Sequence, residues 1–81
     1  MEPVQPQIAL ADDDATDRQL LQAVLASEGF QVWAFGTGSE LLEDLPRRLP
    51  DLFLLDLHLP DVSGLDLLDR IQSRHPHTPV I

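Results

Sequence analysis

The residues best suited to chemistry are acids that stand directly after short apolar runs. Asp12 and Asp13 follow the run 8–11, and Asp56 follows the run 52–55. An all-oxygen, anionic pocket suits Mg²⁺, which accepts one or two carboxylates and keeps water or phosphate oxygens as further ligands. A carboxylate beside such a metal can also act as a nucleophile and form an aspartyl phosphate. The acids therefore predict metal and phosphate chemistry, provided that the fold brings them together.

Each of these motifs alone has a simpler explanation. Asp is common in turns, so Asp56 on its own is equally well read as the start of one. Three consecutive acids before a helix usually provide a cap and solvated charge, and Asp14 is best placed as that N-cap, with Asp17 at the capping-box position. The choice between these readings depends on the elements that position the acids.

Apolar runs and helical stripes alternate along the chain. The predicted strands cover residues 8–11, 30–35, 52–55 and 78–81. The predicted helices cover residues 15–28, about 39–45, and a third segment that Ser63 caps and Pro76 ends. The alternation β-α-β-α-β-α-β is typical of parallel strands joined by right-handed helical crossovers. The predicted fold class is therefore α/β, a doubly wound parallel sheet between two helix layers.

Leucine-rich stripes predict the buried face of each helix, and Trp33 is predicted to belong to the core. The stripe residues are Leu20, Leu21, Val24 and Leu25 in the first helix, Leu41, Leu42 and Leu45 in the second, and Leu65, Leu67, Leu68 and Ile71 in the third.

The strand order decides whether the acids meet. Doubly wound sheets commonly use the order 2-1-3-4-5, and the part expected here, 2-1-3-4, places the first and third strands side by side. Neighbouring strands lie about 4.8 Å apart. Asp12, Asp13 and Asp56 are therefore expected in one crevice, where their mutual repulsion favours a bound cation.

Composition limits the remaining classes of function. The chain has 81 residues with 14 acids and 5 basic residues, all of them Arg, and a net charge of −9. Such a surface repels nucleic acid phosphate, so we expect no direct nucleic acid binding by this segment. The absence of Cys and of any long apolar run predicts a soluble, cytoplasmic chain without disulfides. Residues 1–7 are predicted to be a disordered tail and residues 8–81 a domain.

Over residues 8–81 the chain resembles the receiver domain of two-component response regulators, a flavodoxin-like family that includes the chemotaxis regulators. The resemblance rests on four motifs in register: the acid pair Asp12-Asp13, Asp56 at the end of an apolar strand, the run 59–64 (Leu-Pro-Asp-Val-Ser-Gly), and the entry 78–81 (Thr-Pro-Val-Ile) to a fourth strand.

The resemblance implies a signalling phosphoacceptor rather than an enzyme. Asp56 would accept a phosphoryl group from a sensor histidine kinase or a phosphotransfer protein. Asp13 and Asp56 would hold Mg²⁺ directly, Asp12 would act largely through water, and His58 would offer its backbone carbonyl. The His58 imidazole is expected to face solvent, and His75 and His77 are not expected to form a metal site.

The chain departs from the family in length. Receiver domains have five strands and five helices, whereas this sequence stops in the fourth strand. The family's phosphoryl-binding Ser or Thr, its Lys and its aromatic switch residue would lie beyond that point. From the sequence we therefore expect a truncated receiver with impaired phosphorylation, and self-association through an exposed fourth-strand edge.

Two other classes of function compete with this interpretation. Phosphatases of the haloacid dehalogenase type also use an Asp nucleophile at a strand end, but their Asp-x-Asp motif is broken here because His58 stands at the third position. An interaction domain that keeps the fold without the chemistry would not require Asp12, Asp13 and Asp56 together.

Overall fold

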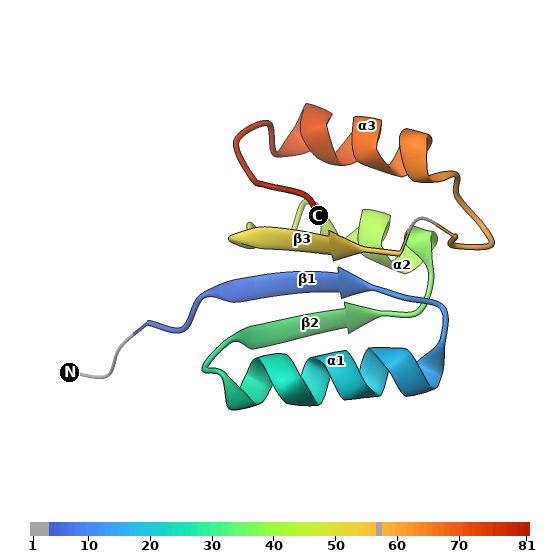
Figure 1. Cartoon of the computed structure of the whole chain (residues 1–81). Helices are drawn as coiled ribbons and strands as arrows, with labels where there is room; N and C mark the ends of the chain where they lie inside the picture. The colour runs from blue at the N-terminus through green and yellow to red at the C-terminus, as the bar shows by residue number, and fades with distance from the viewer. Residues whose placement is uncertain (1–3, 57) are drawn as a thin grey trace.

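The computed structural model describes residues 4–56 and 58–81, which form a three-layer α/β domain (Figure 1). Strands and helices alternate along the chain, as the sequence predicts. The elements are β1 (Gln7–Ala11), α1 (Ala15–Ser27), β2 (Gln31–Phe35), α2 (Gly38–Asp44), β3 (Leu52–Leu55) and α3 (Gly64–Arg74).

The three strands are parallel and lie in the order β2-β1-β3. Ala9 in β1 is aligned with Trp33 on one side and Phe53 on the other. This order confirms the doubly wound sheet and puts the ends of β1 and β3 next to each other. The prediction of a fourth strand over 78–81 is too long, because Val80 forms a single parallel bridge with Phe53. That bridge nevertheless lies beside β3, as the order 2-1-3-4 requires.

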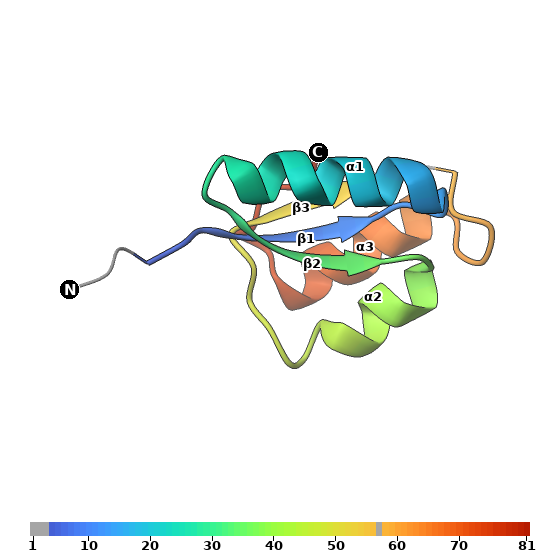
Figure 2. The same cartoon turned by 90° about the horizontal axis from the view of Figure 1, so that it is seen from below.

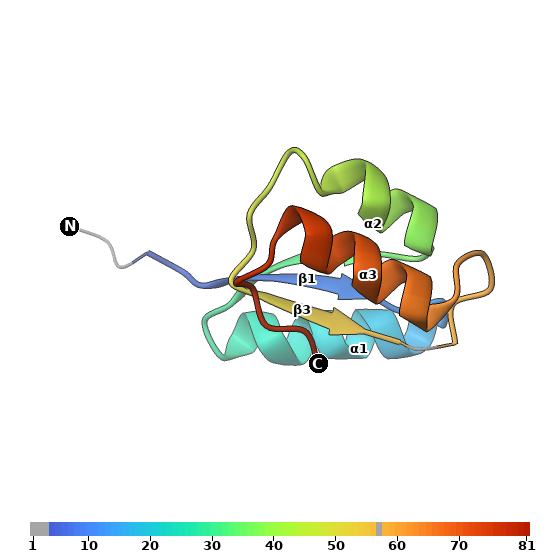
Figure 3. The ribbon, with the colours of Figure 1, turned by 90° about the horizontal axis from the view of Figure 1, so that it is seen from above.

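Helices α2 and α3 cover one face of the sheet and α1 covers the other (Figures 2 and 3). The main core lies under α2 and α3, where Leu41, Leu67 and Ile71 are almost completely buried. Phe53 from β3 and Ala9 from β1 belong to the same cluster. The stripe predicted for α2 is confirmed, since Leu41 and Leu45 are buried and Leu42 packs against the cluster.

The stripe predicted for α1 is only partly buried. None of the α1 residues is fully buried, and the side chains of Leu20 and Val24 are 62% and 50% exposed. Leu21 and Leu25 are half-buried. The sequence identifies the apolar side of this helix, but one helix lying on a three-stranded face covers only part of that side.

Leu65 and Trp33 also differ from the prediction. Leu65 is 81% exposed, because it lies two residues from buried Leu67 and so about 200° around α3. Trp33 is half-buried at the edge strand, with the Arg48 guanidinium 3.8 Å above its ring centroid. A cation lying on the aromatic face replaces the apolar cover that a core position would have.

Side-chain caps fix the start of every helix. Asp14, Thr37 and Ser63 accept hydrogen bonds from the backbone N–H three residues later, as predicted for α1 and α3. Gly29, at the end of α1, has φ of 95°, a left-handed conformation that favours glycine.

The chain ends add two details. The first three residues of the predicted tail lie outside the described residues, and β1 begins at Gln7, one residue before the predicted strand. The Gln7 N–H donates to the Asp51 carboxylate at 2.7 Å. In the part of the chain that the structure describes, no helix has the length and apolarity needed to span a bilayer.

Candidate metal centre

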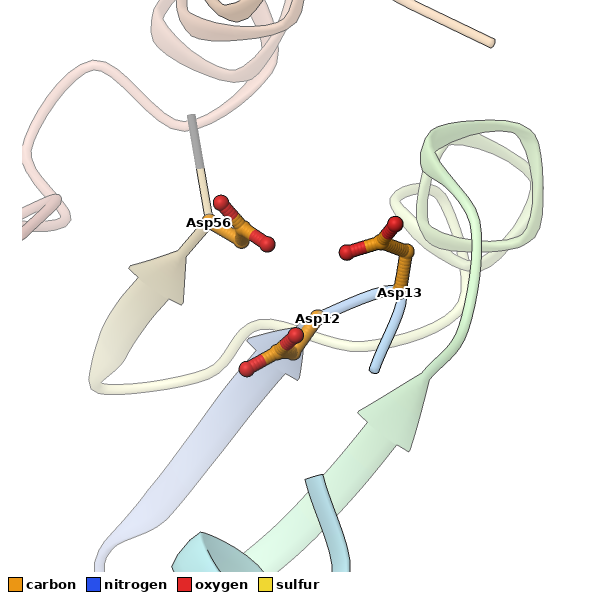
Figure 4. A group of neighbouring side chains, drawn as sticks. All are labelled: Asp12, Asp13 and Asp56. Carbon is orange, nitrogen blue, oxygen red and sulfur yellow. The ribbon is translucent and has the colours of Figure 1, made fainter. Parts of the chain in front are cut away.

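Three carboxylates meet where β1 and β3 end. One oxygen from each of Asp12, Asp13 and Asp56 lies within 4.8 Å of the others. Figure 4 shows Asp13 and Asp56 pointing toward each other, with Asp12 at the tip of β1. The convergence predicted from the strand order is therefore present in the structure.

The sheet itself places these acids. The backbone N–H of Asp12 donates to Phe35 O at 3.1 Å, and the N–H of Asp56 donates to Ala11 O at 2.8 Å. The parallel ladder thus continues for one residue past the strands and fixes the backbone of both acids. Asp12 and Asp56 are half-buried and Asp13 is exposed, so the pocket opens to solvent on the Asp13 side.

Asp13 and Asp56 influence each other's protonation. The pKa of Asp13 is raised, first by hydrogen bonding with the Asp56 carboxyl and then by desolvation and by the negative charge of Asp56. The pKa of Asp56 is lowered, chiefly because the His58 backbone N–H donates to its carboxylate at 2.9 Å. Of the two carboxyls, Asp56 therefore has the lower pKa.

The residues present fit a hard divalent cation. Their donors are all carboxylate oxygens, the ligand type that Mg²⁺ prefers. After the hydrogen bond with Asp56 and desolvation, the negative charges of Asp56 and Asp12 also raise the pKa of Asp13, and a cation would offset these charges. Within residues 4–56 and 58–81 no second cluster of three such ligands occurs.

Among the described residues, the potential metal ligands that cluster are Asp12, Asp13 and Asp56, and the histidines lie outside this cluster. His58 is exposed, and the metal-binding role of its carbonyl stays a prediction; its neighbour Leu57 lies outside the described residues. His75 stacks on Phe53 with ring centroids 5.8 Å apart, and its Nε2 lies 2.9 Å from Leu45 O. A carbonyl can only accept, so Nε2 donates and His75 joins α3 to α2.

Sequence reasoning missed two residues that organise the loops around the acids. Arg18 donates from Nη1 to Asp12 O at 2.8 Å. Asp61, assigned from the sequence only to a loop, accepts hydrogen bonds from Gly38 and Ser39 at the start of α2. The Asp61 contact joins residues 22 and 23 positions apart, and no local pattern signals such a pair.

The response regulator receiver domain family model matches residues 8–81. The chain is 42% identical over 72 residues to the DNA-binding transcriptional regulator NtrC of Escherichia coli. It is 39% identical over 72 residues to the luminescence regulatory protein LuxO of Vibrio campbellii. These alignments cover 89% of this chain but only 15% and 16% of the two relatives.

Solved structures show the same architecture. The chemotaxis response regulator CheY4 of Vibrio cholerae superposes with a TM-score of 0.88 at 24% identity, over 95% of this chain and 66% of that protein. The response regulator TrrA, solved in complex with the histidine kinase ThkA, superposes with a TM-score of 0.86 at 28% identity. That match covers 94% of this chain and 66% of the other.

Proposed function

The chain belongs to the family of response regulator receiver domains, the signalling modules of two-component systems, and from this premise we propose that Asp56 is its phosphoacceptor. The observation that carries the proposal is the cluster of Asp12, Asp13 and Asp56 within 4.8 Å at two adjacent strand ends. Asp56 is the member that follows β3, and its lowered pKa keeps it ionised and able to attack.

We assign the other residues to metal binding. Asp13 and Asp56 would coordinate Mg²⁺ directly, Asp12 largely through water, and His58 through its backbone carbonyl. When bound, the ion would neutralise negative charge on the transferring phosphoryl oxygens. The chain's own contribution is to hold the Asp56 carboxylate in place through the His58 N–H.

The proposed phosphoryl donor is the phosphohistidine of a sensor histidine kinase or a phosphotransfer protein. An Asp56 oxygen would form a bond to phosphorus while the bond between phosphorus and the histidine nitrogen breaks, and the released imidazole nitrogen would take a proton from water. The structure of TrrA in complex with a histidine kinase supports this class of partner.

Acyl phosphate and Mg²⁺, applied to the whole chain, test the assignment. An acid-stable, base-labile adduct is expected on Asp56 by mass spectrometry, and Asp56→Asn should abolish it. Asp13→Ala should weaken Mn²⁺ binding by about tenfold or more, as measured by electron paramagnetic resonance of the free ion. An adduct on Asp12 or Asp13 instead would overturn the assignment.

The alternative functions find less support. The receiver family model spans the domain from residue 8 to residue 81, and this favours a receiver over a phosphatase of the haloacid dehalogenase type. A domain that only binds other proteins would not require the three carboxylates to lie together.

We also propose self-association of the 81-residue polypeptide through the edge beside β3. The backbone groups of Pro79 and Ile81 pair with Phe53, so those of Val80 point away from β3. The Ile81 side chain is 73% exposed, and an apolar edge of this kind recruits another strand. Sedimentation at micromolar concentration should show a dimer or larger species that Ile81→Lys dissociates. A compact monomer for the parent would refute this part of the proposal.

A further inference from the structure

The loop that follows Asp56 is anchored to the start of α2 by a single carboxylate. Asp61 accepts hydrogen bonds from Gly38 N and Ser39 N, both at 2.9 Å, and from Ser39 Oγ at 2.7 Å. These three bonds lower the pKa of Asp61 to about 2. Thr37 already caps α2 through the N–H of Glu40, so Asp61 is a second cap contributed by a distant loop.

Close packing supports the same contact. A Cβ on Gly38 would lie 2.8 Å from Val62 Cγ2 and 3.3 Å from Asp61 Oδ1. The loop thus approaches α2 more closely than any residue other than glycine permits at position 38. Val62 also packs against the core cluster, and this contact fixes the end of the loop that leads into α3.

The residue at the end of β2, just before the turn into α2, also contacts one of the acids. Phe35 O, just before the turn into α2, accepts the N–H of Asp12. Arg18 donates to Asp12 O, and its Nη1 lies 3.1 Å from the position that a Cβ on Gly36 would take. The turn 36–39 therefore contacts the loop after β3 through Asp61. Gly36 lies next to the Arg18 side chain, which is itself bonded to the loop after β1.

We propose that Asp61 is a positioning residue that couples the acid cluster to the N-terminal turn of α2. The contact fixes residues 58–61, the segment that carries the His58 carbonyl, and it transmits a change at that segment to Gly38 and Ser39. This inference rests on the proposed function, because it assumes that an ion binds at Asp12, Asp13 and Asp56. Coupling is reciprocal: a contact that helps the ion bind is itself strengthened when the ion is bound.

Charge alone would produce part of the effect, so the experiment has to separate charge from contact. Asp61→Asn removes one negative charge near the site and replaces one of the two accepting oxygens with an amide NH₂ group. Because an NH₂ group cannot accept, the bond from Gly38 and the two bonds from Ser39 cannot all be kept. Asp66→Asn removes a charge from a neighbouring exposed acid that makes no described contact with α2. Gly38→Ala leaves the charge unchanged and displaces the loop from the α2 side through Val62.

Mn²⁺ affinity of the whole chain is the first readout. Loss of a residue that orients metal ligands typically costs 10- to 100-fold in affinity, and we expect about tenfold for Asp61→Asn. Asp66→Asn and Thr37→Val should each change affinity by about twofold or less; Thr37→Val weakens α2 without touching the loop. Gly38→Ala should resemble Asp61→Asn, although Ala favours a helix more than Gly does. Adding Val62→Ala, which makes room for the new methyl group, should restore binding.

Hydrogen exchange at the amides of Gly38 and Ser39 is the second readout. If Asp61 were a cap with a purely structural role, Mg²⁺ would not change the exchange rate of these amides. Saturating Mg²⁺ should slow exchange of both amides about fivefold or more in the parent and leave it unchanged in Asp61→Asn. Far-UV circular dichroism checks that each variant is folded. If Asp61→Asn equals Asp66→Asn in affinity and its amides still respond to Mg²⁺, the coupling does not exist. If the parent binds no ion, or binds it equally well with Asp13→Ala, the proposed metal centre fails first and the coupling fails with it.

Discussion

The helices that cover the two faces of the sheet have similar apolar stripes, but their side chains are buried to different degrees. Under α2 and α3, leucines and Ile71 interlock with Phe53 and are almost fully buried. On the opposite face α1 has no fully buried residue, although its apolar stripe is as regular. An open groove of about 370 Å³ remains there between α1 and β3, lined by Leu10, Leu21 and Leu54 and reaching Asp12 and Asp56.

The difference shows that a helical stripe reports which side of a helix is apolar, and not how much of that side is covered. Burial depends on how many elements share the face, because apolar free energy follows the area removed from water. The acids lie at the boundary between the faces. On the well-packed side, Asp61 holds the loop that follows Asp56. On the open side, Arg18 holds the loop that carries Asp12 and Asp13.

The same substitution on each face gives the largest expected contrast. Leu67→Ala in α3 removes a fully buried side chain and should lower the free energy of unfolding by about 3 kcal/mol. Leu20→Ala in α1, at a position 62% exposed, should cost about 0.5 kcal/mol or less. Urea denaturation of both variants and the parent measures the difference. Equal losses would mean that α1 is covered in solution and that the two faces are alike.

His75 gives a second, smaller contrast within the well-packed face. Its ring stacks on Phe53 and its Nε2–H donates to Leu45 O, which joins the ends of α2 and α3. Loss of the stack and the hydrogen bond in His75→Ala should cost about 1–2 kcal/mol. The neighbouring exposed His77 is the matched control, and His77→Ala should leave the urea midpoint nearly unchanged. A similar midpoint for both variants would show that the two helices dock without this bridge.

Local patterns were sufficient to predict the strand order, the helix starts and the acid cluster. Continuous apolar runs and the caps Asp14 and Ser63 act within a few residues, and the strand order common in doubly wound sheets then brings the ends of β1 and β3 together. Asp12 and Asp56 directly follow a strand, and Asp13 stands next to Asp12, which is why the sequence predicts all three in one crevice.

The features that sequence did not predict depend on contacts between distant residues. The exposure of Leu20 depends on what lies opposite α1, whereas that of Leu65 follows from its angle around α3. The Asp61 contact needs a loop and a helix start that are 23 residues apart to meet at a glycine. The cover over Trp33 comes from Arg48, which also pairs with Asp44. No periodic pattern in the sequence indicates the contact of Asp61 with Gly38 or that of Arg48 with Trp33.

The caps of α1 and α3 extend the comparison to local stability. Removing either cap, by Asp14→Ala or Ser63→Ala, should weaken its helix by about 1 kcal/mol, or about fivefold in local opening. On the open face we expect this loss as faster hydrogen exchange at Asp17 and Arg18, because no buried side chain keeps the start of α1 in place. On the packed face Leu67 and Ile71 hold α3, so Ser63→Ala should change the global urea midpoint instead. If Ser63→Ala speeds hydrogen exchange only within α3 and leaves the urea midpoint unchanged, the buried side chains do not hold the start of α3 in place.

The smallest expected effect is a pH dependence that arises from the contact between Asp61 and the start of α2. Its pKa is about 2 in the folded chain, below the ordinary value of 3.8, mainly because Ser39 donates to it from both Oγ and N. A carboxyl with a lowered pKa stabilises the fold above its unfolded pKa, and that contribution disappears as the pH falls from about 4 to about 2. Ser39→Ala removes the hydroxyl donor, so the Asp61 pKa should rise toward its ordinary value, as followed by carboxyl ¹³C shifts. Asp61→Asn should remove this component of acid unfolding altogether. An unchanged Asp61 titration in Ser39→Ala would mean that the two backbone N–H groups alone stabilise the carboxylate, and that the contact tolerates loss of the serine.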